Sequence, residues 1–96
     1  MLTGVDGRAG DDRLVATLHL GGNQINDFPL EIINLENLTD LDVSDCGLGE
    51  LPIEIARLDK LKTLNLSGND IDRLPPGLVS LAALETLYLN DNGLEE

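Results

Sequence analysis

The chain of 96 residues is poor in aromatic residues, basic residues and cysteine. It has no Trp, and Phe28 and Tyr88 are its only aromatic residues, so a core must be built from aliphatic side chains. Its 6 basic residues stand against 18 acidic ones, which gives a formal net charge of −12. A field of this sign repels nucleic-acid phosphates and anionic lipid surfaces and attracts basic proteins. We therefore expect no nucleic-acid partner and no membrane partner.

A single cysteine, Cys46, excludes an internal disulfide. No stretch approaches the roughly 20 apolar residues of a membrane span. Residues 1–10 contain acid and glycine where a secretory signal needs an apolar run. Because reducing compartments keep thiols free, these features predict a cytoplasmic protein.

Leucine is abundant and recurs with a strict period. Segments that begin at Val15, Leu38, Leu61 and Leu84 align without gaps, 23 residues apart. The same positions of each segment are apolar every time, although apolar residues make up only 42% of the chain. Such regularity indicates stacked structural repeats. We predict one domain over residues 1–96, with repeats at 15–37, 38–60, 61–83 and 84–96, the last partial and without a C-terminal cap.

The repeat has a recognisable motif. The third repeat reads Leu61-Lys-Thr-Leu64-Asn-Leu66-Ser-Gly-Asn69-Asp-Ile71 and continues to Leu74-Pro75, Leu78 and Leu81. The pattern L-x-x-L-x-L-x-x-N-x-L with a Leu-Pro corner resembles the leucine-rich repeat. Its length is similar to that of the intracellular Ras-group, scribble-like and Roco repeats. The resemblance implies an α/β fold, a short right-handed horseshoe arc with parallel strands on the concave face and short helical or 3₁₀ turns on the convex face.

Local patterns agree with this fold. The alternation of Leu18 and Leu20 places both side chains on one face of a short strand. After the Leu-Pro corner, apolar residues three apart, such as Ile55 and Leu58, suit short helical or 3₁₀ turns. Residues 2–6 and the start of the first repeat predict a cap hairpin within residues 1–14.

One polar position ends each strand in the same place. Its four occupants are Asn23, Cys46, Asn69 and Asn92. In leucine-rich repeats the Asn in this position turns the chain and bonds to the backbone of neighbouring turns, and the resemblance assigns that role here. A thiol is a small, weak donor, so Cys46 suits the position structurally.

The outward strand positions form rows that suit protein binding. The predicted binding residues are Thr17, His19, Asp40, Asp42, Thr63, Asn65, Thr86 and Tyr88. The family binds partners mostly on this concave face, which implies a protein-interaction or scaffold module. Its acidic centre favours a basic protein or peptide, and Tyr88 is a favoured type of interface anchor. Solvated strand residues without a specific partner are the alternative.

Catalysis and metal binding are not predicted. His19 beside Asp42 resembles a general base oriented by a carboxylate. Ser44 and Ser67, however, are expected in the wrong row for a hydrogen bond to this base, so no catalytic triad is expected. Acidic residues around Asp42 offer no enclosing loop for a cation. We therefore expect no catalytic residues, no metal, no cofactor and no enzymatic activity.

The last repeat leaves an apolar end open, formed by Leu84, Leu87, Leu89 and Leu94. Three explanations stay open: a piece of a longer protein, self-association into a homodimer, or a short natural or engineered solenoid. A regulatory segment of a larger enzyme, such as a GTPase or kinase, is a further functional alternative. On the convex side a minor, partly exposed apolar patch is expected from Ile33, Ile53, Val79, Ala82 and Ala83.

Overall fold

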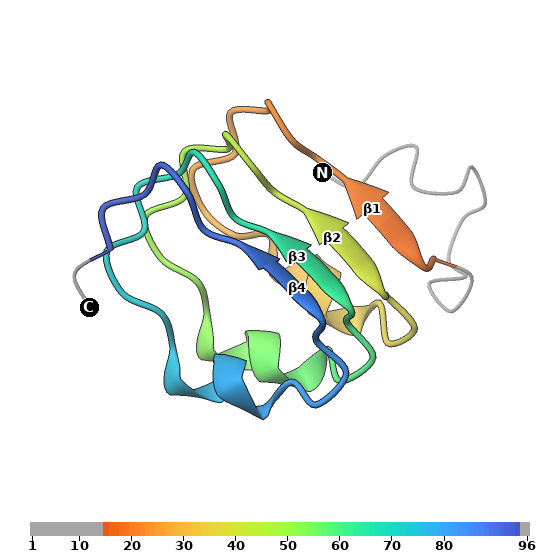
Figure 1. The fold of residues 1–96 in the computed structure, drawn as a ribbon. Coiled ribbons are helices and arrows are strands. Elements are labelled where there is room, and N and C mark those ends of the chain that lie inside the picture. The colour runs from red at the N-terminus through yellow and green to blue at the C-terminus, as the bar shows by residue number, and fades with distance from the viewer. Residues whose placement is uncertain (1–14, 95–96) are drawn as a thin grey trace.

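A computed structural model describes residues 15–94 of the chain. The predicted hairpin in residues 1–14 lies outside this part. Short strands alternate with short 3₁₀ helices, and within residues 15–94 each of the first three repeats has one strand and one helix while the last has a strand alone (Figure 1). In chain order the elements are β1 (Thr17–His19), η2 (Leu30–Asn34), β2 (Asp40–Asp42), η3 (Ile53–Arg57), β3 (Thr63–Asn65), η4 (Pro76–Ser80) and β4 (Thr86–Tyr88).

The four strands form one parallel sheet in the order β1-β2-β3-β4. Leu18 pairs with Leu41, Leu41 with Leu64 and Leu64 with Leu87, so each residue lies beside its equivalent in the next repeat. The chain leaves each strand, turns, and returns behind the sheet through a 3₁₀ helix (Figure 1). This arrangement confirms the predicted leucine-rich-repeat solenoid.

The core consists of stacked aliphatic layers between the sheet and the return segments. The central strand residues Leu18, Leu41 and Leu64 are 6%, 1% and 0% exposed, respectively. Ile55 and Leu58 close the layers from the return side and are equally buried. Each buried leucine contributes about 2 kcal/mol of transfer free energy, which explains why a chain nearly without aromatics holds one core.

Proline sets the start of each return helix. Pro29, Pro52 and Pro75 precede η2, η3 and η4 with φ of −71°, −70° and −68° in extended backbone. Each helix is only five residues long and is 3₁₀, not α. Gly77 lets η4 approach η3, because a Cβ at this position would lie 2.9 Å from Cβ of Ala56. No helix within residues 15–94 is long and apolar enough to cross a membrane.

The expected apolar patch on the helix side is only partly correct. Ile53 and Val79 are 72% and 92% exposed, and Ala82 is also exposed. Ile33 instead belongs to the core at 8% exposure. Ile33 on η2 is therefore enclosed, whereas its equivalent Val79 on η4 is not.

Candidate protein-binding face

The register brings the predicted binding residues into two rows on one surface, which we call the strand face. One row contains Thr17, Asp40, Thr63 and Thr86, and the other contains His19, Asp42, Asn65 and Tyr88. Neighbours within a row belong to adjacent strands, which lie about 4.8 Å apart. A period of 23 residues therefore becomes a compact surface contributed by four repeats.

These side chains are available to solvent to different degrees. Thr17, His19 and Tyr88 are exposed, whereas the β2 carboxylates Asp40 and Asp42 are half-buried. Tyr88 exposes 49% of its surface. A half-exposed tyrosine two strands from two half-buried carboxylates offers apolar contact and charge on one face.

Hydrogen bonds fix the ends of the two central strands. Asp42 Oδ1 accepts from the backbone N–H of Ser44 at 2.9 Å and from its hydroxyl at 2.6 Å. Asn65 Oδ1 likewise accepts from the Ser67 N–H at 3.0 Å. In both turns, the side-chain oxygen accepts a hydrogen bond in place of a backbone carbonyl. A carboxylate has about four acceptor positions, so Asp42 keeps capacity for the donors of a partner.

The hydroxyl of Ser44, which was not expected to reach the imidazole of His19, bonds instead to Asp42, because the chain turns sharply after Val43. The bond joins Ser44 to the carboxylate and not to the imidazole of His19. A nucleophilic triad needs the serine on the imidazole, so this order does not activate the hydroxyl. No group of three or more His, Cys, Asp or Glu side chains within residues 15–94 is placed to hold a metal ion.

The turn after each strand is left-handed. Its four equivalent residues are Gly22, Asp45, Gly68 and Asp91, with φ of 83°, 51°, 74° and 60°. Glycine adopts this region freely, and aspartate is among the few other residues that tolerate it. The 23-residue period places these four residues in equivalent positions, but their shared positive φ is seen only in the structure.

Asn69 links two adjacent turns of the solenoid. Its Oδ1 accepts from the N–H groups of Cys46 at 2.9 Å and Leu48 at 3.0 Å. Its Nδ2 donates to the carbonyls of Val43 at 3.0 Å and Leu66 at 2.8 Å. The residue is 4% exposed, so these bonds satisfy groups that water does not reach.

The other occupants of this position differ from Asn69. Asn92 bonds to the backbone of Leu66 and Ile71 in the same way. The Cys46 thiol donates to the carbonyl of Leu20 at 3.2 Å, and burial raises its pKa, partly offset by nearby backbone N–H groups. Asn23 is exposed, and its amide donates to the carbonyl of Leu20. A thiol cannot replace the amide oxygen as an acceptor, so the Ile25 N–H bonds to the Cys46 carbonyl instead.

The four leucines of the last repeat are all partly buried and pack against the core. They are Leu84, Leu87, Leu89 and Leu94. Their equivalents in the third repeat, such as Leu64 and Leu66, are fully buried.

Comparison with known proteins agrees with this geometry. The family model for the leucine-rich repeat matches residues 36–94, so the chain belongs to the leucine-rich-repeat family. A solved leucine-rich-repeat protein of Leptospira interrogans has a similar structure, with a TM-score of 0.76 and 37% sequence identity. The match covers 78% of this chain and only 19% of that protein. No curated protein sequence matches significantly. Membership supports a protein-interaction role in general, and the family is typically non-enzymatic.

Exposed Ile53 belongs to a row of equivalent residues whose other members the sequence patterns did not predict. Leu30, Ile53 and Pro76 each follow the proline of the Leu-Pro corner, and all three are exposed. An apolar residue or proline at one fixed position outside the core pattern was the signal that could have revealed it.

Proposed function

We propose that the chain is a protein-interaction module that binds a basic protein or peptide across the strand face. The observation that carries the proposal is the presence of two carboxylates, Asp40 and Asp42, on β2. Asp42 is in register with exposed His19 and lies two strands from half-exposed Tyr88. No lysine or arginine occurs among the eight residues of this face. A cationic side chain therefore meets carboxylates there without a competing charge.

The net charge of the chain and the small size of the strand face favour fast association and weak affinity. The formal net charge of −12 steers a basic partner toward the chain and raises the association rate at low salt. Four strands of three residues present a small surface, which favours a weak interaction. We expect an extended basic segment with one apolar or aromatic contact at Tyr88.

Selection from a random displayed peptide library tests the proposal. One bait is the unmodified chain and the second is the Asp42→Arg/Tyr88→Ala variant, whose folding is first checked by circular dichroism. The control bait is Glu31→Arg/Val79→Ala, which makes the same charge change at exposed residues on the helix side. The proposal expects peptides rich in Lys and Arg from the unmodified chain and the control, but not from the strand-face variant.

Two outcomes contradict the proposal. One is that peptides from the unmodified chain bind the strand-face variant equally well. The other is that they carry no excess of basic residues. In either case the acidic strand face is a solvated surface without this role.

Self-association is a second candidate function. It is favoured because Leu84, Leu87, Leu89 and Leu94 are only partly buried and leave apolar surface exposed. Two copies that cover these leucines would remove apolar surface from water. Light scattering over a wide concentration range measures the mass directly. A mass that doubles with concentration, and stays monomeric in a Leu87→Lys variant that keeps its fold, supports it. A monomer at high concentration contradicts it.

A further inference from the structure

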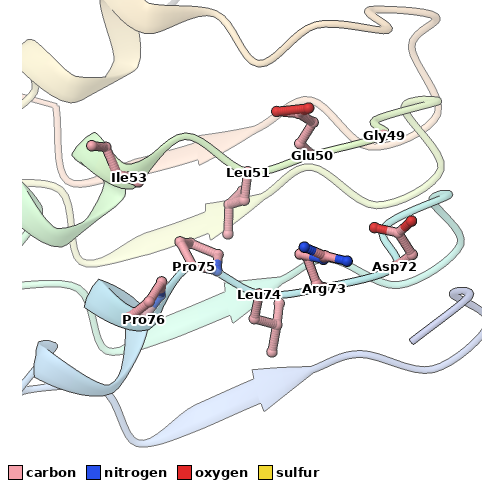
Figure 2. A pocket seen from close by; sticks show the side chains of 9 residues that line it. All are labelled: Gly49, Glu50, Leu51, Ile53, Asp72, Arg73, Leu74, Pro75 and Pro76. Atoms are coloured by element: carbon pink, nitrogen blue, oxygen red, sulfur yellow. The ribbon is translucent and has the colours of Figure 1, made fainter. Parts of the chain in front are cut away.

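Two open hollows lie on the return segments, behind the sheet. The first, of about 440 Å³, lies between residues 49–53 and 72–76 (Figure 2). The second, of about 580 Å³, lies between residues 26–30 and 47–52. Gly49 and Glu50 line both hollows, so the two adjoin at these residues and together extend over three repeats. We call the two adjoining hollows the return groove.

One flank of the return groove is apolar and repeats with the solenoid. Leu30, Ile53 and Pro76 occupy equivalent positions, one at the start of each 3₁₀ helix, and all three line the hollows. Leu30 and Ile53 are 58% and 72% exposed. Exposed aliphatic side chains repeated along a hollow differ from the isolated surface aliphatics of most proteins.

The other flank carries charge in a fixed order. Asp27, Glu50 and Arg73 are equivalent residues of successive repeats, so the order along the groove is negative, negative, positive. Asp72 adds a third carboxylate beside Arg73 (Figure 2). This order defines the direction of a complementary chain as well as its charge.

Gly49 keeps the junction of the two hollows open. A Cβ built on this residue has no atom within 4 Å, and its φ lies outside the left-handed region. A side chain at this position, which lines both hollows, would therefore meet no other part of the described chain at its Cβ. The position offers a way to block the groove alone.

We infer that the return groove binds an extended peptide in which apolar residues alternate with two basic residues followed by an acidic one. Alternate side chains of an extended chain point to opposite sides, so the apolar set would contact Leu30, Ile53 and Pro76 while the charged set faces Asp27, Glu50 and Arg73. This site lies on the return segments and does not depend on the strand face.

A peptide titration followed by NMR tests the inference on the full ¹⁵N-labelled chain. The probe is acetyl-Ser-Leu-Lys-Leu-Lys-Leu-Glu-Ser-amide, and its charge-swapped partner replaces each Lys by Glu and the Glu by Lys. The inference expects amide shifts from the first peptide at residues 26–30, 49–53 and 72–76. It expects the charge-swapped peptide to bind about tenfold more weakly or not at all.

Matched variants locate the site. Gly49→Trp should abolish the shifts by filling the groove, whereas Gly49→Ala, which adds only a methyl group to open space, should preserve them. Glu50→Lys should weaken binding about fivefold by reversing the central charge of the row. The strand-face variant Asp42→Arg/Tyr88→Ala should bind the probe as the unmodified chain does, so failure of this inference and failure of the strand-face proposal give different results.

Three results would overturn the inference. The first is no amide shift at millimolar peptide, and the second is equal binding of the two peptides. The third is unchanged affinity in a Gly49→Trp variant that is folded by circular dichroism.

Discussion

The side-chain oxygen of Asn69 accepts a 2.9 Å hydrogen bond from the backbone N–H of Cys46, which occupies the same position one repeat earlier. One repeat thus satisfies the backbone of the one before it. Because the bond is buried, the stability of the second and third repeats is coupled. The central strands β2 and β3 of the strand face belong to these two repeats, so the geometry of its centre depends on this contact.

Replacing Asn69 by Ala should destabilise the solenoid strongly. The N–H groups of Cys46 and Leu48 would lose their acceptor in a buried place, at a cost of about 3 kcal/mol in total. Urea unfolding followed by circular dichroism measures the change. Asn23→Ala is the matched control, because Asn23 is exposed, and it should cost less than about 1 kcal/mol. Equal losses in the two variants would contradict the role of Asn69.

Replacing Cys46 by Asn should stabilise the chain by about 1 kcal/mol. An amide there can donate to the Leu20 carbonyl, as the thiol does now, and can also accept from the first repeat. Cys46→Ala is the control and should lose stability. Urea unfolding followed by circular dichroism compares the stability of the two variants. A loss of stability in Cys46→Asn as large as that in Cys46→Ala would show that the position cannot hold an amide.

The buried thiol should make stability depend on alkaline pH. Burial raises the pKa of Cys46 above the ordinary value of 9.0, so the unfolded chain releases this proton first. The contribution is therefore complete below about pH 9 and is lost as the pH rises through the folded pKa. The stability difference between the unmodified chain and Cys46→Ala should shift against the unmodified chain above that pH. A difference that stays constant with pH would contradict this.

The left-handed turn after β3 should reject a side chain. Gly68 has a φ of 74°, so Gly68→Ala should cost about 1 kcal/mol or more through backbone strain. Gly49→Ala is the matched control, since its backbone is unstrained and its Cβ meets nothing. Thermal unfolding of both variants tests the difference. A Gly68→Ala variant as stable as Gly49→Ala would contradict the strain.

The period, together with the resemblance to leucine-rich repeats, predicted the sheet and the rows of the strand face. Since residues 23 positions apart become neighbours in parallel strands, His19 had to lie beside Asp42 and Asn65 beside Tyr88. The pattern also placed Asn69 at a strand end, where its amide proves to be buried. Repetition converts sequence spacing into spatial contact, and few other folds allow this.

Features that depend on the path between strands were not predictable. The bond from Ser44 to Asp42 requires the sharp turn after the strand. The period also does not distinguish Ile33, which is buried, from its equivalent Val79, which is exposed. The return groove depends on how far apart adjacent return segments lie, which periodicity does not specify. Whether each turn is 3₁₀ or α was also left open by apolar residues three apart.

The most direct test of the strand face is a titration calorimetry series with a basic peptide obtained from the library selection. The account predicts that Asp42→Arg/Tyr88→Ala weakens binding at least about tenfold, while Glu31→Arg/Val79→Ala leaves the affinity unchanged apart from long-range charge. Equal affinity for the unmodified chain and the strand-face variant, or equal weakening in both variants, would contradict the claim that this surface binds the partner.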